Sequence, residues 1–112
     1  MEVSETHRFA RVTPRKARLV LEHLPGHSIE EALNLLKFLP TPHARVVAKI
    51  VKSAASNAEN NFSLDPDSLY VKRAVAGDAR RMPRARPASR GRVTRVTRHS
   101  SHITITVDQR EN

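Results

Sequence analysis

The stretch RMPRARPASRGRVTRVTRHSSHITITV, residues 81–107, combines two contrasting patterns. Its first part is rich in arginine, and Pro83, Pro87 and Gly91 exclude a regular helix there. Its last part, HITITV, alternates strictly between apolar and hydroxyl side chains, which is typical of a strand with one buried face. The stretch therefore predicts an extended basic segment that continues directly into a strand of the core.

The positive charge of the chain is concentrated in this basic segment. The formal net charge is +9, and the 12 basic residues outside residues 80–98 are nearly balanced by 11 acidic ones. Lysine is absent from the segment, although five lysines occur elsewhere. Arginine presents a planar fork of donors that suits phosphate, so this preference indicates more than solubility. The arginines of the segment are Arg80, Arg81, Arg84, Arg86, Arg90, Arg92, Arg95 and Arg98.

The N-terminal part predicts a strand around residues 6–12 and then a helix. Thr13 followed by Pro14 is typical of a helix N-cap with proline at the first helical position, and residues 25–26 (Pro-Gly) end the helix. Its apolar positions are Ala17, Val20, Leu21 and Leu24. Three cations lie in its first turns, and their pattern fits either ordinary solvated side chains or an anion-binding site. They are Arg15, Lys16 and Arg18.

Two further helices are predicted. Ser28 and Glu31 form a capping box, and the helix that they open ends before Pro40. A threonine–proline pair at residues 41–42 predicts the start of a third helix, which runs to about residue 60. The expected buried positions of the second helix are Ala32, Leu33, Leu35, Leu36 and Leu39; those of the third are Ala44, Val47, Ala48, Ile50, Val51, Ala54, Ala55 and Ala58.

The basic segment connects two predicted strands. Residues 69–76 (LYVKRAVA) are rich in strand formers and can pair antiparallel with residues 102–107. The segment between them is then a β-hairpin that projects from the body, with its tip at residues 87–91. In its second strand, Arg92 and Arg98 would lie on one face and Arg95 on the other, so neither face packs on a core. An isolated hairpin of this kind should be mobile in water.

Composition and motifs exclude several classes of protein. A chain of 112 residues forms one domain, and it contains no apolar run long enough for a membrane span and no signal-peptide pattern at its start. Cysteine is absent, and the six histidines show no metal-ligand spacing. The sequence contains no glycine-rich phosphate loop and no nucleophile elbow. We therefore expect no enzyme activity, cofactor, metal or small-molecule substrate.

Nucleic acid is the partner that this charge distribution favours. Phosphate neutralisation releases counterions and provides salt-sensitive affinity. The basic segment has no aromatic residues that could stack on the bases of a single strand, so recognition of the backbone and shape of a folded RNA fits better. An anionic membrane is the weaker alternative, since the basic segment lacks a bulky apolar face. A free-standing RNA-binding regulator, such as a translational repressor, is a second functional reading.

Six motifs, in order, resemble one family. VTPRKARLVLEHLPG, LLKFLP, VKSAASNAENN, LDPDSLYVK, RMPRAR and GRVTRVTRHSSHITI are similar to segments of the universal large-subunit ribosomal protein L-twenty-two family, in its bacterial type. The resemblance covers about residues 5–107. It implies an α+β fold, in which three helices pack on a small three-stranded antiparallel sheet and a long arginine-rich β-hairpin protrudes. We expect a single domain over residues 1–112, with a body of residues 1–79 and 99–112 and a hairpin of residues 80–98.

The resemblance also implies a function and the residues that serve it. The family's members are structural constituents of the large ribosomal subunit that bind rRNA, assist assembly and line the nascent-peptide tunnel with the hairpin tip. The expected partners are rRNA, neighbouring ribosomal proteins and the nascent polypeptide, in cytoplasmic or organellar ribosomes. The implied rRNA contacts are Arg15, Lys16, Arg18 and the eight arginines of residues 80–98. The implied tunnel-lining tip is Arg86, Pro87, Ala88, Ser89, Arg90 and Gly91.

Two features depart from the family pattern as we compare it. The tip is longer, because residues 87–90 (Pro-Ala-Ser-Arg) stand where many members pass almost directly to glycine–arginine. The strand before the hairpin ends in residues 76–79 (Ala-Gly-Asp-Ala) in place of a glycine–proline pair. For His102, at the start of the last strand, a structural role is expected rather than a direct contact with RNA.

Overall fold

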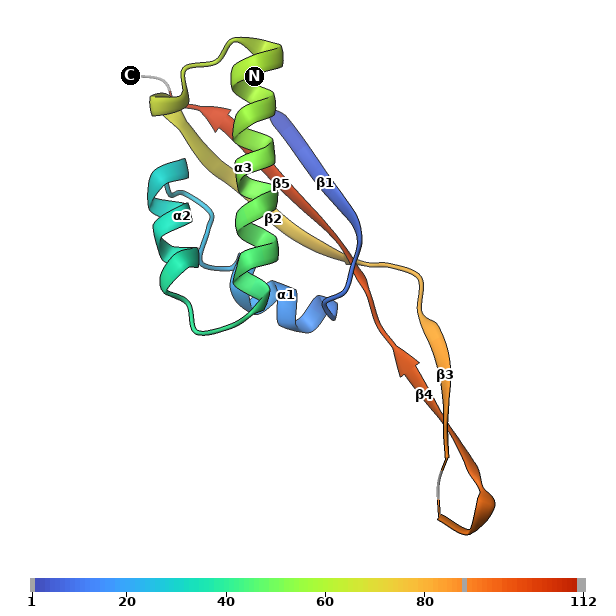
Figure 1. Cartoon of the computed structure of the whole chain (residues 1–112). Helices are drawn as coiled ribbons and strands as arrows, with labels where there is room; N and C mark the ends of the chain where they lie inside the picture. The colour runs from blue at the N-terminus through green and yellow to red at the C-terminus, as the bar shows by residue number, and fades with distance from the viewer. Residues whose placement is uncertain (1, 88, 111–112) are drawn as a thin grey trace.

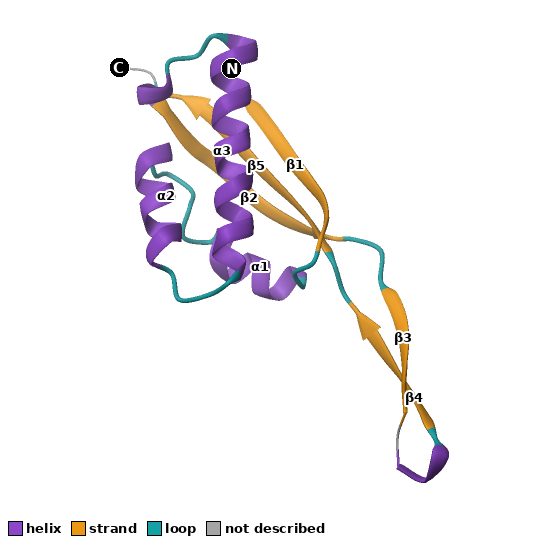
Figure 2. Cartoon of the chain, viewed as in Figure 1, coloured by secondary structure: helices purple, strands orange, loops and turns teal. Residues whose placement is uncertain are grey.

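The computed structural model describes residues 2–87 and 89–110, and within them every side chain but those of Met82, Thr94, Arg95 and Val96. The described chain is α+β, as expected, with helices packed on a sheet and a separate hairpin (Figures 1 and 2). Short 3-10 turns lie at Pro66–Ser68 and Ser89–Gly91. The elements are β1 (Val3–Ala10), α1 (Pro14–Leu21), α2 (Ile29–Phe38), α3 (His43–Phe62), β2 (Leu69–Asp78), β3 (Met82–Pro87), β4 (Val93–Arg98) and β5 (Ser101–Gln109).

The body is a three-stranded antiparallel sheet in the order β1-β5-β2, with its helices on one face (Figure 1). The last strand in sequence is therefore the central strand. Its alternation is confirmed, because Ile103, Ile105 and Val107 are fully buried towards the helices. Hydroxyl groups line the other face, where Thr104 and Thr106 bond Thr6 and Ser4 of β1 at 3.0 and 2.9 Å.

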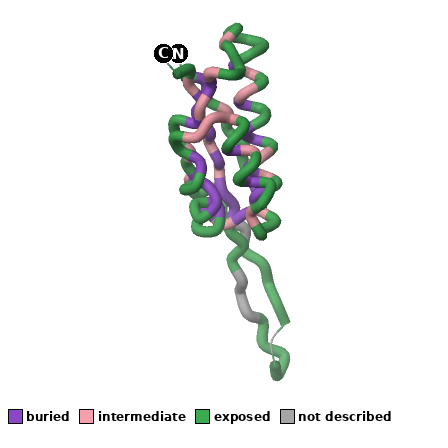
Figure 3. Tube along the Cα trace, turned by 90° about the vertical axis from the view of Figure 1, so that its left-hand side faces the viewer, coloured by how far each residue is buried: buried purple, intermediate pink, exposed green. Residues whose placement is uncertain are grey.

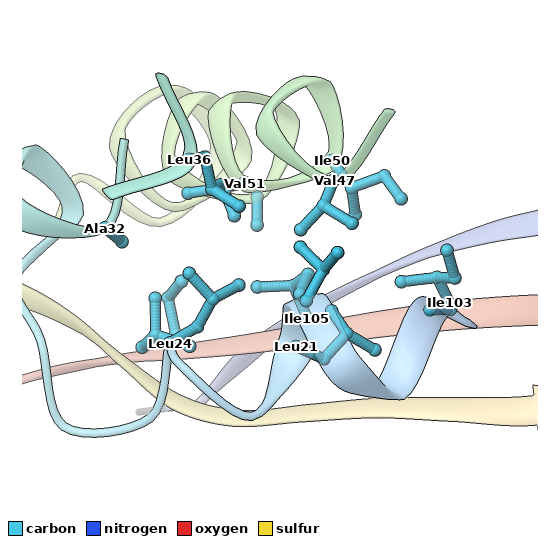
Figure 4. Close-up of a cluster of buried hydrophobic side chains, with 14 of the residues drawn as sticks. Leu21, Leu24, Ala32, Leu36, Val47, Ile50, Val51, Ile103 and Ile105 are labelled. Atoms are coloured by element: carbon cyan, nitrogen blue, oxygen red, sulfur yellow. The ribbon is translucent and has the colours of Figure 1, made fainter. Parts of the chain in front are cut away.

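The core lies between the sheet and α3. Figure 4 shows Val47, Ile50 and Val51 of α3 pointing at Ile105 of β5 and at Leu21 of α1. The small alanines of α3 leave room for this close packing, and Ala44, Ala54 and Ala58 are fully covered. Six of the eight predicted apolar positions of α3 are buried and two are half-buried. Leu35 of α2 was wrongly expected inside, since it lies on the outer side of its helix and is 38% exposed.

Two of the three helices start where the sequence predicted. The hydroxyl oxygens of Thr13 and Ser28 accept the amide hydrogens of Lys16 and Glu31, which confirms both predicted N-caps. The third helix differs, because α3 starts at His43 after Pro42, and no side chain caps it. The first strand also differs. β1 covers residues 3–10 rather than 6–12, because it pairs with β5 along its whole length from Val3 onwards.

The hairpin of β3 and β4, here called the arm, projects far beyond the body (Figure 1). The molecule measures 66 × 26 × 17 Å and has a radius of gyration of 17.1 Å. A compact chain of this length would have a radius of gyration of about 13 Å. Figure 3 shows that the buried residues are confined to the body, whereas the described residues of the arm are exposed. The described side chains of the arm therefore form no core of their own.

Candidate RNA interface

The pairing register of the arm sorts its side chains between two unlike faces. Arg84 and Arg86 alternate with Pro83, Ala85 and Pro87 along β3. Residues that pair across a ladder share a face, so the partner of Met82, Arg98, joins the face of Arg84 and Arg86. The opposite face carries Pro83, Ala85, Pro87, Val93 and Thr97.

The predicted distribution of arginines on the arm needs one correction. Arginines were expected on both faces, and the backbone of Arg95 does pair with Ala85, on the proline side of the ladder. Arg92, however, was expected in the strand and on the face of Arg98. It lies instead before β4, in the connection after the 3-10 turn, because β4 begins only at Val93. The described arginines of the ladder therefore gather on one face.

The arginines of residues 80–98 whose side chains are described make no ion pair with a carboxylate of the described chain. All of them are exposed. The ion pairs that do involve lysine or arginine lie at the other end of the sheet, where Glu2 contacts Lys72 and Arg73. The hydrogen bond from Lys72 lowers the pKa of the Glu2 carboxyl, and the same bond raises the pKa of Lys72. The arm therefore presents unneutralised charge to a partner.

Two serines hold the base of the arm. The hydroxyl of Ser100 donates to the carbonyl oxygen of Arg80 at 3.0 Å, and the amide of Ala79 donates to the carbonyl oxygen of Ser100 at 3.1 Å. The hydroxyl of the fully buried Ser101 donates to the carbonyl oxygen of Val12 at 2.8 Å. The first two bonds join the segments that lead into and out of the arm, and the third joins the start of β5 to the segment before α1. We did not single out these roles from the sequence, where adjacent serines resemble an ordinary turn.

The second predicted basic group lies on α1, which starts at the base of the arm. The contact between Ser101 and Val12, two residues before the helix, fixes this position (Figure 1). Arg15 and Lys16 are exposed in the first turn, which contains no acidic residue. Arg18 differs, since its Nε and Nη2 atoms donate to the carbonyl oxygen of Ala76 at 3.2 and 2.9 Å. Arg18 thus links α1 to β2 by hydrogen bonds, and only its remaining donors are free for a partner.

The tip is a tight turn. Arg90 and Gly91 both have positive φ, at 63° and 71°, a conformation that glycine adopts easily and arginine only at a cost. The side chains of Arg86, Pro87, Ser89 and Arg90 are exposed there. Ala88, which we also predicted to line the tip, lies outside the described residues. Of the expected site residues, those of α1 thus lie at the base of the arm, and Arg84, Arg86 and Arg98 share one face of its ladder.

The described surface of the body also has two hollows, one of which lies beside the contact of His27 with Glu31. A groove of about 790 Å³ between α2 and α3 is lined by apolar residues and by Asn34, Thr41, Lys37, Arg45 and Lys52, without histidine or carboxylate. The described residues contain no cluster of three metal-ligating side chains. Among those residues, no helix has the length and apolar character that crossing a membrane requires. The Nδ1 atom of His102 accepts the amide of Phe9 at 3.1 Å, which agrees with the structural role expected of it.

A small α+β body that carries an exposed, arginine-rich arm is typical of proteins that bind polyanions. A family model described as "Ribosomal protein L22p/L17e" matches residues 5–108. The chain therefore belongs to this ribosomal protein family, as its motifs predicted, and the expectation that it is not an enzyme is confirmed.

Curated relatives agree with this assignment. A protein from Thermoanaerobacter sp. (strain X514), named "Large ribosomal subunit protein uL22", is 43% identical over 111 residues, which is 99% of this chain and 100% of the relative. A protein of the same name from Thermomicrobium roseum is 45% identical over 109 residues, or 97% of this chain and 92% of the relative. Both sources are bacterial, so the expected bacterial type is confirmed.

Proposed function

We propose that this ribosomal protein is a structural constituent of the large subunit of the cytoplasmic ribosome in a bacterium, where it binds rRNA and assists assembly. The observation that carries the proposal is the arm, whose described arginines are exposed and unpaired with carboxylates. Such a surface is stable only where counter-charge meets it, and RNA phosphates supply that charge. The names of the bacterial relatives give further support.

The arm acts as a clamp in this proposal. Because it has no core, its order in water is marginal, and contacts with phosphates complete its stabilisation. A thin arm can enter between RNA segments before they close around it. Its arginine face, with Arg84, Arg86 and Arg98, then contacts the backbone, while Arg15 and Lys16 contact RNA at the base of the arm. Neighbouring ribosomal proteins are further partners of the body.

The tip of the arm lies against the nascent polypeptide in the exit tunnel, as we further propose. The support is the family resemblance and the length of the molecule, since the tip is the point most remote from the body (Figure 1).

Sedimentation of a cell extract through a sucrose gradient at raised salt tests the ribosomal placement. Contacts made only to an exposed RNA surface weaken steeply with salt, whereas an arm enclosed by folded RNA is retained. We expect the protein, followed by immunoblot, to migrate with the large subunit. Its appearance in the light fractions alone would contradict the proposal and favour a free RNA-binding regulator.

A further inference from the structure

Phe9 combines a left-handed backbone conformation with an exposed aromatic ring. Its φ is 57°, in the left-handed region that is a genuine outlier for a bulky residue. It is also 59% exposed. Phe38 is 81% exposed, yet it lies on the regular helix α2 with no such backbone strain. A glycine at position 9 would relieve the strain, and no burial of the ring compensates for it, so the aromatic side chain has to be accounted for by another contact.

A β-bulge and His102 hold Phe9 in place. His7 pairs with Ile103 and Ala10 pairs with Ser101, so Arg8 and Phe9 together lie opposite the single residue His102. The amide of Phe9 donates to Nδ1 of His102 at 3.1 Å. The two rings meet edge to face, with centroids 4.8 Å apart and an angle of 80° between their planes. The exposed ring is therefore fixed in orientation before any partner arrives.

The sheet beside this aromatic pair is open. Ile103 points towards the helices, so its neighbour His102 points to the face of the sheet that no helix covers (Figure 1). Gly77 pairs with His102 on the other side, on β2. A Cβ atom built on Gly77 would meet no atom within 4 Å, so this position adds no bulk. Phe9, His102 and Gly77 thus form a row across three strands. The aromatic ring of Phe9 lies at one end, and Gly77, which has no side chain, lies at the other.

Exposed arginines lie near the row along the chain, and the exposed Asp78 follows Gly77. Arg8 and Arg11 flank Phe9 closely in sequence, and both are exposed. Ala10 and Asp78 both pair with Ser101, which places the row one step from the base of the arm and from the exposed Arg80. An acidic peptide would use the cations without the ring, and an apolar segment would use the ring without the cations. A nucleotide uses both, through its base and its phosphate.

We infer that the row of Phe9, His102 and Gly77 binds one unpaired RNA base, stacked on Phe9, with its phosphates held by Arg8 and Arg11. This inference rests on the proposed rRNA binding and adds a single-base contact at the base of the arm. Residues 80–98 contain no aromatic residue, so stacking on a base is inferred for the body alone. A pocket for one base needs only the one ring that the body supplies.

A tryptophan at position 9 gives a direct test, because the chain contains no tryptophan of its own. The probe is large-subunit rRNA transcribed from a bacterial relative such as Thermomicrobium roseum. We expect the fluorescence of the Phe9→Trp variant to be quenched when this RNA binds, since a base stacks on the indole. The matched control is Phe38→Trp, whose fluorescence should not change. Unquenched Phe9→Trp in a complex that forms normally would overturn the inference.

Affinity measurements separate stacking from apolar contact and from folding. By filter binding, Phe9→Ala and Phe9→Leu should bind this RNA about tenfold more weakly, as expected for one lost stacked base, and Phe9→Tyr should bind like the unaltered protein. Phe9→Gly should bind as weakly as Phe9→Ala but melt at the same or a higher temperature, since it relieves the backbone strain. Gly77→Leu should block the row and weaken binding with Phe9 intact.

The outcomes distinguish the inference from the proposed function. If Phe9→Ala and Gly77→Leu bind like the unaltered protein, the base site is wrong, while rRNA binding stands. If the unaltered protein itself fails to bind the RNA, both proposals are wrong. Loss of binding by Phe9→Ala together with full binding by Phe9→Leu would also overturn the inference, because an apolar contact would then suffice.

Discussion

At the scale of single residues, replacing glycine by alanine is expected to have opposite effects on stability at two positions. Gly26 has a φ of 89°, which residues with a side chain rarely adopt. Its amide donates to the carbonyl oxygen of Val71 at 2.8 Å. Gly77 lies within β2 with an ordinary φ and open space around a built Cβ. We predict that Gly77→Ala raises the free energy of unfolding by about 0.5–1 kcal/mol, because alanine loses less entropy on folding.

The same change at position 26 should have the opposite sign. Gly26→Ala is expected to lower the free energy of unfolding by about 1–2 kcal/mol, since it forces an L side chain into the left-handed region. Urea unfolding followed by circular dichroism measures both variants under one set of conditions. Equal effects of the two substitutions would contradict this account of the backbone at either site.

At the scale of elements, the side chain of Ser101 joins the first residue of β5 to the connection before α1. Its hydroxyl is fully buried and donates to the carbonyl oxygen of Val12. We predict that Ser101→Ala lowers the free energy of unfolding by about 1–3 kcal/mol, because it leaves this carbonyl without its donor in a buried place. The control is Ser4→Ala, which removes a hydroxyl bond to Thr106 near solvent on the open face.

Ser4→Ala should change stability less than Ser101→Ala, because Ser4 is exposed and water can take the place of its hydroxyl beside the buried Thr106. Thermal unfolding of both variants at neutral pH provides the comparison. A Ser101→Ala protein as stable as the unaltered chain would show that the contact with Val12 does not fasten the base of the arm.

At the scale of the whole molecule, the buried core and the arginine face of the arm lie in different parts. The accessible surface is 8045 Å², against about 6,200 Å² for a compact protein of this mass, because the arm adds surface without a core. We predict that replacing Arg84, Arg86, Arg92 and Arg98 by alanine leaves the thermal unfolding of the body nearly unchanged. Subunit assembly should nevertheless fail when this variant is the only copy in the cell.

The matched variant replaces the same four arginines by lysine and so retains the charge. It should assemble subunits with an intermediate yield, because an ammonium group cannot make the two parallel bonds to phosphate that a guanidinium makes. Sucrose-gradient profiles of ribosomal subunits measure the yield. Normal yield with the alanine variant would contradict the clamp, and normal yield with the lysine variant would show that charge alone is sufficient.

Local patterns determined much of this protein from the sequence alone. The caps at Thr13 and Ser28 and the alternation of residues 103–107 depend on neighbours in the chain, so they were predicted correctly. The charge of the arm was visible because an arginine run without acidic residues needs no tertiary information. The ends of β1 and the start of α3 were less well placed, since strand pairing and packing decide them.

The tertiary structure alone decided which side chains meet across the sheet. Pairing register, which no local pattern reveals, placed Arg84, Arg86 and Arg98 on one face of the arm and put Phe9 and Gly77 on either side of His102. The packing of α1 on β2 also brought Arg18 to the carbonyl oxygen of Ala76, 58 residues away in the sequence. Local propensity acts over a few residues, whereas contacts between distant strands exist only after the chain has closed on itself.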